Sequence, residues 1–367
     1  MKGEFCRVVE RVAIWDNAKF FVLVLVVAGH LMDGIRFDGL AANWLYTSIY
    51  LFHMPLMMFI AGYFSRAELS AKVANSIIQL CVTYLLWEVL IGVFRYFLSG
   101  WTPSADFIST PSRAMWFLLS LACLKLVLPV FIRLKHPLAV AVLIALAAGA
   151  FQGIDDTLTI SRTLGFLPFF VGGYVSRQRG VFEKSWFHQP TVKMRVGAGA
   201  FTALVGTVLW VALSQDDLPA VYRWLYRRYN YWELTDSNRA RIELLPVDGS
   251  GDSTWLVVAN GVLANGLLLV LAFAVGFAVL LLIPRSRIVL TSLGQNTLYI
   301  YLLHIPLIHV ESEFGIVPEL FANLGVWALA LVLVVSTIVA LVLGSSSMKR
   351  LTRRIVEPDV SGIVTDT

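Results

Sequence analysis

The sequence predicts an all-α fold, a polytopic membrane helical bundle of about ten transmembrane helices with both termini in the cytoplasm. Three observations support this prediction. The 367 residues are 58% hydrophobic and only 14% charged, with a mean hydropathy of +0.74, whereas a soluble domain carries about a quarter charged residues. Apolar runs long enough to cross about 30 Å of hydrocarbon recur from end to end. Basic residues cluster between alternate runs, which is typical of a chain oriented in a bilayer.

The apolar runs give the expected spans. Ten runs are long enough to count: Ala13–Met32, Trp44–Phe64, Ala74–Leu98, Ala114–Phe131, Leu138–Phe151, Thr163–Val175, Gly197–Leu213, Trp255–Ile283, Ile288–Val310 and Leu320–Leu343. The fifth and sixth runs are short and the eighth is long, so nine or eleven spans are the alternatives. A cleaved signal peptide competes for the first run alone, because basic residues precede it, but no small-residue cleavage pattern follows it.

The charges between the runs predict the orientation. Loops on one side, and both chain ends, are basic, as at Arg66, Lys135 and Arg350, whereas short loops on the other side are acidic, as at Asp33 and Asp106. The positive-inside rule therefore places both ends in the cytoplasm, which requires an even number of spans. We expect a multi-pass protein of the cell (plasma or inner) membrane, in contact with the lipid bilayer. The net charge of +5 forms no single basic patch, so nucleic acid is not an expected partner.

We expect one transmembrane domain over residues 1–355 and a short cytoplasmic tail over residues 356–367. One outer loop, about residues 215–253, is unusual because it holds five arginines among tyrosines, tryptophans and acids. It is interpreted either as an aromatic interfacial helix with a flexible tail or as a platform for a sugar or another polar acceptor. The three cysteines, Cys6, Cys81 and Cys123, are widely spaced. They indicate no disulfide framework or zinc site, and no metal is expected.

The first run carries ionisable residues within "WDNAKFFVLVLVVAGHLMDG", residues 15–34. Lys19 and His30 are eleven residues apart, or about three helical turns, so they share one face about 16 Å apart along the axis. Asp16, one turn before Lys19, can pair with it. A structural interpretation is open, in which Lys19 snorkels, Asp16 caps the helix and His30 bonds another helix. Ionisable groups inside a membrane nevertheless usually face a cavity or a pathway.

Later runs carry further polar residues. His53 lies in the second run and Arg162 at an outer helix end, while Tyr301 and His304 lie one turn apart in the ninth run. Glu88 lies in the third run. Each residue alone fits structural hydrogen bonding. Four of the six histidines lie in spans, however, and this concentration favours a functional cavity.

Five segments, taken in order, resemble a known family. They are "RVAIWDNAKFFVLVLVVAGH", "LFHMPLMMFIAGYF", "MWFLLSLACLKL", "RTLGFLPFFVGGY" and "LGQNTLYIYLLH". Over nearly the whole chain they resemble the acyltransferase-3 family of integral-membrane O-acyltransferases, particularly fucose O-acetylase-like members. The resemblance implies an enzyme that moves an acyl group, commonly acetyl, from cytoplasmic acyl-CoA to a hydroxyl of a glycan, lipid-linked sugar or similar acceptor. It implies no tightly bound cofactor, because acyl-CoA is a co-substrate.

The resemblance also implies roles for residues. The family's hallmark, a basic residue and a histidine separated by ten residues, falls on Lys19 and His30. Many members carry arginine at the first position, and lysine keeps the charge but lacks the bidentate fork. We expect Lys19 to bind CoA phosphates, Asp16 to orient it, and His30 to act as general base or to form an acyl-histidine. We expect His53 and Arg162 to bind substrate, with support from Glu88, Tyr301 and His304. Trp116 is interpreted as packing or an interfacial anchor.

Two other function classes compete with an acyltransferase. A secondary transporter or flippase of a polar solute shares the many spans, buried charges and broken helices, although the sequence contains no clear internal repeat. A non-catalytic membrane scaffold or sensor would leave the alignment of Lys19 with His30 unexplained. An assay of acyl transfer against solute movement separates the first two classes.

Overall fold

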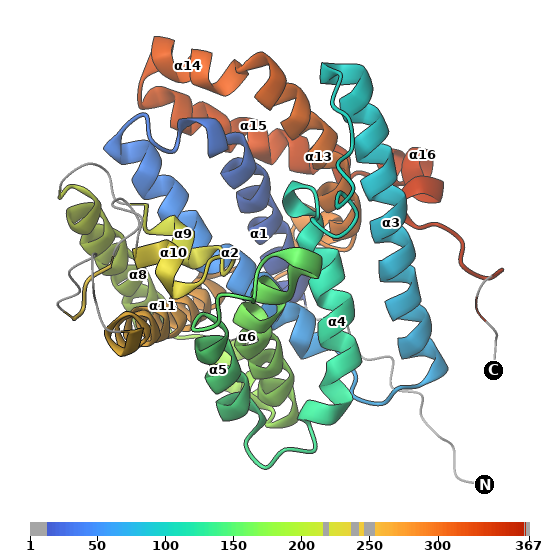
Figure 1. Ribbon diagram of the computed structural model, residues 1–367. Helices are drawn as coiled ribbons and strands as arrows, with labels where there is room; N and C mark the ends of the chain where they lie inside the picture. Colours follow the sequence, from blue (N-terminus) through green and yellow to red (C-terminus); the bar gives the residue numbers. More distant parts are fainter. Residues whose placement is uncertain (1–12, 216–219, 236–241, 246–253, 363, 365–367) are drawn as a thin grey trace, which may run out of the picture.

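The structure is a computed structural model that describes residues 13–215, 220–235, 242–245, 254–362 and 364. Every regular element within these residues is helical (Figure 1). Seven helices are long and apolar enough to cross a membrane, and two bent helix pairs raise that number to nine. The predicted fold class, a polytopic membrane helical bundle, is confirmed.

The helices fall into three groups. Those of spanning length are α1 (Ala13–Leu31), α2 (Leu40–Phe64), α3 (Ala71–Ser99), α4 (Trp116–Phe131) with η2 (Arg113–Met115) before it, α6 (Ile160–Gln178) with η3 (Thr157–Thr159) before it, α8 (Val192–Leu213) and α11 (Thr254–Leu282). The bent pairs are α13 (Thr297–Phe314) with α14 (Ile316–Leu324), and α15 (Trp327–Leu343) with α16 (Ser346–Val356). The short helices are η1 (Asp33–Ile35), α5 (Pro137–Ala148), η4 (Val181–Glu183), α7 (Ser185–His188), α9 (Tyr222–Leu225), α10 (Tyr231–Thr235) and α12 (Val289–Leu293).

The last two expected spans differ from the structure at two glycines. The chain leaves α12 at Gly294, where an added Cβ would lie 1.9 Å from the carbonyl oxygen of Asp16. The expected ninth span therefore begins only with α13. Gly325 has a φ of +57°, a conformation that residues with a Cβ rarely adopt, and it separates α14 from α15. The expected tenth span is thus divided, and its first residues belong to the preceding bent pair.

The bundle is built around α1, which lies at its centre and is mostly buried (Figure 1). It contacts α2, α12, α13 and α15, while α2 packs most closely on α6. Glycines make that second contact possible. A Cβ on Gly62 would lie 1.9 Å from the Phe170 carbonyl oxygen, and one on Gly173 would lie 2.0 Å from that of Phe59. The two backbones therefore touch directly.

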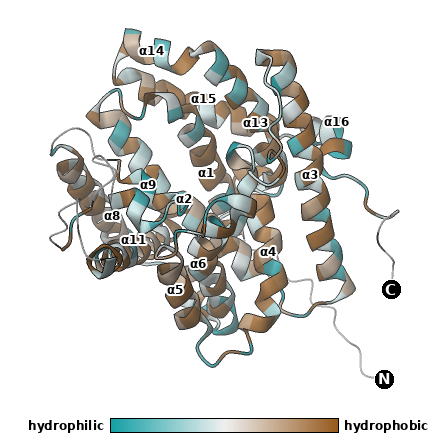
Figure 2. Ribbon diagram, viewed as in Figure 1, coloured by the Kyte–Doolittle hydropathy of each residue, from teal (hydrophilic) through white to brown (hydrophobic). Residues whose placement is uncertain are grey.

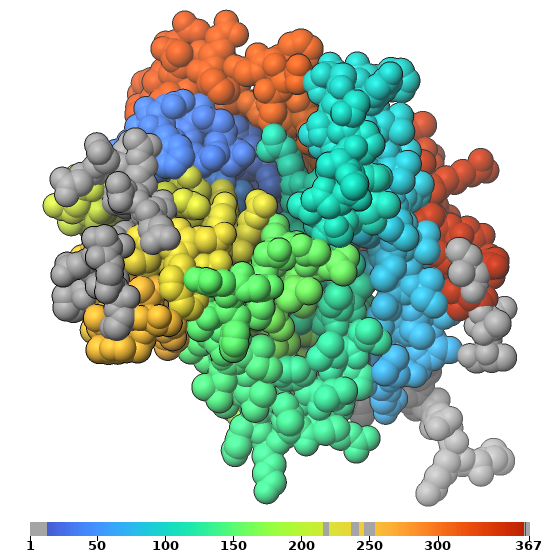
Figure 3. All heavy atoms as spheres, in the orientation of Figure 1, coloured from blue at the N-terminus to red at the C-terminus, as the bar shows by residue number. Residues whose placement is uncertain are grey.

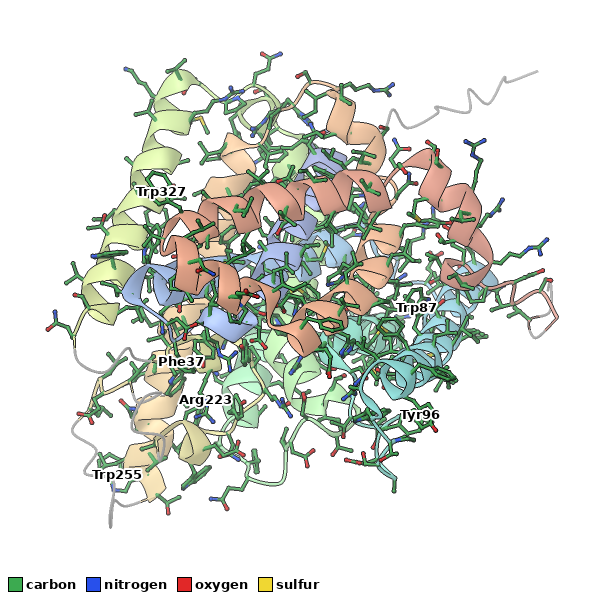
Figure 4. All side chains as sticks on the ribbon, turned by 90° about the horizontal axis from the view of Figure 1, so that it is seen from above. Phe37, Trp87, Tyr96, Arg223, Trp255 and Trp327 are labelled. Atoms are coloured by element: carbon green, nitrogen blue, oxygen red, sulfur yellow. The ribbon has the colours of Figure 1, made fainter. Side chains whose placement is uncertain are left out.

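Many large apolar residues are exposed on the bundle, and hydrophobic residues run along its long helices (Figure 2). The helices α3 and α8 are largely exposed, and Trp255 and Trp327, which lie at the periphery in Figure 4, are 66% and 76% exposed. In water such a surface would drive association, because soluble monomers rarely expose large apolar patches. The surface fits a hydrocarbon solvent, and several ionisable residues of the spans are buried: Asp16, His53, Glu88 and His304.

Candidate active site

A polar cavity of about 160 Å³ lies inside the bundle, and we call it the central cavity. Its walls come from α1, α2, η2 and α4, α6, α13 and the segment after α9, and its mouth is seen in Figure 3 where these segments meet. Four of the residues expected from the sequence line it: His30, His53, Arg162 and Tyr301. Other polar residues of the wall are Asp33, Tyr50, Arg113 and Tyr226.

Three imidazoles belong to this region. The ring of His30 lies 5.5 Å from that of His304, measured between centroids. The Nδ1 atom of His53 is 2.7 Å from the carbonyl oxygen of Ile49, and that of His304 is 3.1 Å from the carbonyl oxygen of Ile300. A carbonyl oxygen only accepts hydrogen bonds, so Nδ1 holds the proton in each neutral ring and Nε2 keeps its lone pair. The Nε2 of His304 has no hydrogen-bond partner among the described residues.

Lys19 lies outside the central cavity. Its Nζ is 2.7 Å from Oδ1 of Asp16 and 5.9 Å from the ring centre of Phe64, and its side chain is 18% exposed. The pair with Asp16 is the one that the one-turn spacing allows. His30, eleven residues further along α1, opens into the central cavity. The structure thus places the two residues of the sequence motif in different surroundings.

Glu88 does not line the central cavity, but it holds the segment that carries Arg113. Its two carboxylate oxygens each accept a 2.8 Å hydrogen bond, one from the backbone N–H and one from the hydroxyl of Ser112. The next residue, Arg113, has a φ of +39°, which is uncommon for a residue with a side chain. Its Nη1 lies 3.5 Å from Asp33, and its Nη2 donates a 2.7 Å hydrogen bond to Ser312. Glu88 therefore fixes a cation at the cavity wall.

Arg162 lies in the first turn of α6 and is held on two sides. Its Nε is 3.0 Å from Oδ1 of Asp156, and its guanidinium lies 5.0 Å from the ring centre of Trp116. Asp156 also pairs with Arg228 at 3.1 Å. Burial raises the pKa of Asp156 above its usual range, although both arginines lower it. Trp116, which the sequence led us to interpret as packing or an interfacial anchor, lines the cavity and stacks on Phe166.

A hydrogen-bond network lies beside the central cavity and includes Asp33 and Tyr226 of its wall. Asp33 accepts from Arg36 at 2.7 Å and from the hydroxyl of Tyr46 at 3.0 Å. Arg36 also donates a 3.0 Å hydrogen bond to the hydroxyl of Tyr222, and the hydroxyls of Tyr46 and Tyr226 bond each other. Burial lowers the pKa of Arg36, but Asp33 and Tyr222 outweigh it and raise that pKa above its usual range. The network ties the loop after α1 to the segment of α9, and Phe37 and Arg223 mark these two segments in Figure 4.

The outer loop packs on the bundle in part. We call residues 220–235 the aromatic segment; it contains α9 and α10, and Tyr222, Trp224 and Tyr231 are buried in it. Tyr231 donates from its backbone N–H to Gly149 at 2.8 Å. This segment reaches the central cavity through Tyr226. Residues 236–241 and 246–253 of the same loop lie outside the described residues.

The fold and the site define a class of protein: a helical membrane protein with a cavity lined by histidines and arginines inside its bundle. A model of the acyltransferase-3 family, described as an acyltransferase domain, matches residues 12–345. The chain therefore belongs to the acyltransferase-3 family of membrane acyltransferases, and the resemblance drawn from its motifs is confirmed.

Curated relatives share part of the chain. A nodulation protein NolL of Mesorhizobium japonicum is 30% identical over 178 residues, which are 45% of this chain and 47% of that protein. A nodulation protein NolL of Sinorhizobium fredii is 32% identical over 117 residues, which are 28% of this chain and 32% of that protein. The chain thus aligns with less than half the length of these relatives. No solved structure matches it.

Proposed function

We propose that the protein is a membrane O-acyltransferase that moves an acyl group, commonly acetyl, from cytoplasmic acyl-CoA to a hydroxyl of a glycan, lipid-linked sugar or similar acceptor. The observation that carries the proposal is the position of His30. Its imidazole lines the central cavity, whose wall also holds Arg113 and Arg162, in a chain that belongs to an acyltransferase family. A neutral imidazole keeps a lone pair on one ring nitrogen, which is suited to take a proton from a hydroxyl.

The chemistry of the step follows from these groups. His30 takes the proton of the acceptor hydroxyl while the hydroxyl oxygen attacks the thioester carbonyl carbon. The carbonyl oxygen gains negative charge, which the guanidinium groups of Arg113 and Arg162 stabilise. The carbon–sulfur bond then breaks, and the CoA thiolate takes up the proton from His30. An acyl-histidine formed on His30 before the acceptor arrives is the alternative order.

The donor would approach from the cytoplasmic end of α1. Lys19 is partly exposed there and already carries an acid partner, Asp16, so it has a fixed ammonium group for a CoA phosphate. It lies about 16 Å along the axis from His30, and the pantetheine arm would run along α1 between them. The proposal requires both termini on the cytoplasmic side of a cell (plasma or inner) membrane, as the positive-inside rule predicts.

The acceptor would bind at the other end, at the mouth of the central cavity. Asp33, Arg36 and Tyr222 offer a carboxylate, a guanidinium and a phenol within one hydrogen-bond network, and such groups bond the hydroxyls of a sugar. The flat face of Phe37, 5.7 Å from the ring of Tyr222, suits the apolar face of a sugar ring. The interpretation of the outer loop as an acceptor platform is the one that this mouth supports.

The test is acyl transfer by the purified protein in nanodiscs, with labelled acetyl-CoA and a glycan and lipid extract, read by mass spectrometry. We expect His30→Ala to lower transfer by about 100-fold or more, with an unchanged thermal unfolding midpoint. His136→Ala is the matched control, because His136 is exposed at the start of α5. Movement of an unmodified solute into proteoliposomes without consumption of CoA would contradict the proposal and favour a transporter or flippase, a class to which broken helices also belong.

A further inference from the structure

A second cavity lies beside the central cavity, between the aromatic segment and helices α5, α6 and α11. We call it the arginine cavity, after Arg227. It has about 20 Å³ of room, which is enough for one water-sized particle. Three side-chain atoms of its wall have no hydrogen-bond partner among the described residues: Nη1 of Arg227, Oγ of Ser161 and Oδ1 of Asn265. Each of these residues is more than nine-tenths buried.

The guanidinium of Arg227 is a buried charge without a described counter-charge. Asp156, the residue just before η3, is engaged by Arg162 and Arg228, and the structure describes no ion pair for Arg227. Burial lowers the pKa of Arg227 to about 10, so the group remains protonated at neutral pH. An isolated charge away from water is strongly unfavourable unless an opposite charge neutralises it.

Arg227 cannot easily turn toward solvent. Its Cβ would lie 2.7 Å from a Cβ built on Gly165, so its stem packs directly on the backbone of α6. Four residues later, the hydroxyl of Tyr231 donates a 2.7 Å hydrogen bond to Leu146, and its backbone is bonded to Gly149. The aromatic segment is therefore fixed on both sides of the guanidinium, and the cavity is preformed.

We propose that the arginine cavity binds one small monovalent anion, chloride or a similar halide. Arg227 supplies the charge and Ser161 a hydroxyl donor. Nδ2 of Asn265 bonds the hydroxyl of Tyr231 at only 3.4 Å, so turning this amide by 180° gives up one long hydrogen bond and presents a third donor to the anion. The size of the cavity excludes phosphate, sulfate and the carboxylates of larger molecules.

The bound anion would link three segments of the structure. It joins α6 (Ser161), α11 (Asn265) and the aromatic segment (Arg227) at one point, and Tyr226, the neighbour of Arg227, lines the central cavity. The bound anion therefore holds one wall of the central cavity in place. Its binding is independent of acyl transfer and is measurable without any substrate.

The experiment is thermal unfolding of the purified protein in nanodiscs in sodium gluconate, with chloride replacing gluconate at constant ionic strength. We expect a saturable rise of the unfolding midpoint by about 2 °C or more, a similar rise with bromide, and none with sulfate. Arg227→Met should lose the rise, and so should Asn265→Asp, which supplies a built-in carboxylate. Arg223→Met is the matched control in the same segment and should keep it.

Two results would overturn the proposal. Equal midpoints of the wild-type protein in chloride and gluconate would show that water alone fills the cavity. A chloride response that persists in Arg227→Met would place the anion elsewhere. Should Arg227→Met fail to fold, Asn265→Asp decides the question, because only an anion bound at Arg227 becomes dispensable when a carboxylate is placed beside it.

Discussion

At the scale of single residues, the imidazoles of His53 and His304 make the same kind of hydrogen bond. Each uses Nδ1 to bond the carbonyl oxygen four residues earlier in its own helix. The bond selects the tautomer and turns the Nε2 lone pair away from the helix. His304 therefore presents a proton acceptor beside His30, at 5.5 Å between ring centroids, and the two rings are close enough to influence each other's proton.

Replacement of His304 tests this neighbour. We expect His304→Ala to lower acyl transfer by about tenfold or more, because the acceptor beside the general base is lost. His309→Ala is a demanding control, since His309 is also buried in α13 and also has an Nε2 without a described partner, yet it does not line the central cavity. Equal losses in the two variants would mean that both histidines only support packing.

Removal of Glu88 tests how Arg113 is held. Glu88→Ala takes away both acceptors of Ser112 and leaves a partly buried N–H group unpaired, which costs up to about 1–3 kcal/mol of folding free energy. We expect a lower thermal unfolding midpoint and reduced transfer, because Arg113 is no longer fixed. Glu313, exposed at the end of α13, serves as control in Glu313→Ala, and a comparable fall in that variant would refute the role.

The residues of the candidate site that lie in helices could be predicted from the sequence. His30, His53, Arg162 and Tyr301 are polar residues in apolar runs, and the cost of placing such groups in hydrocarbon singled them out. Asp33 and Arg113 were missed because both follow or precede a span, where a charged residue is ordinary. Asp33 and Arg113 meet only because two loops that are distant in sequence come together, and Glu88 holds one of these loops. The composition of each loop does not predict this contact.

At the scale of elements, apolar runs located the long helices well. The expected Trp44–Phe64 ends where α2 ends, and Gly197–Leu213 ends where α8 ends. The breaks at Gly294 and Gly325 were not predictable, because glycine is also common inside membrane helices. Gly294 interrupts the apolar run because it contacts the backbone of Asp16. A short stretch of sequence cannot predict a contact between distant segments.

The packing of α2 on α6 gives a prediction at this scale. Gly62→Ala or Gly173→Ala would force a methyl group onto a carbonyl oxygen about 2 Å away, so the helices must separate and open the wall of the central cavity. We expect a large loss of folded protein, measured as the monodisperse fraction in detergent. Gly197→Ala in α8 meets nothing within 4 Å and should be neutral; equal behaviour of the three variants would argue against the close contact.

At the scale of the whole molecule, the bundle exposes many large apolar side chains, and its mostly apolar interior holds a smaller set of buried polar residues. This distribution follows from the solvent, because exposed apolar side chains are stable in lipid and buried ionisable ones need partners. The orientation of the bundle rests on the charges of its loops alone, and it decides which end of α1 meets the donor.

Labelling with a membrane-impermeant maleimide checks that orientation. We expect Ser104→Cys to react in intact cells, because its loop is acidic and outer, and Lys135→Cys to react only after permeabilisation, because its loop is basic and inner. Both positions are exposed, and Cys6→Ser, Cys81→Ser and Cys123→Ser together remove the three thiols of the sequence from the background. The opposite labelling pattern would invert the bundle and move Lys19 away from the cytoplasm.

The shortness of α5 has a consequence for the bilayer itself. Its 12 residues reach only about 18 Å, well below the roughly 30 Å of a typical hydrocarbon layer, and Leu143 on its outer side is 65% exposed. We expect the lipids beside α5 to thin locally to match it, at a modest cost per ångström of mismatch. We expect the protein to unfold at a higher temperature in short-chain than in long-chain phosphatidylcholine nanodiscs, so that membrane thickness itself becomes a variable that tunes the enzyme.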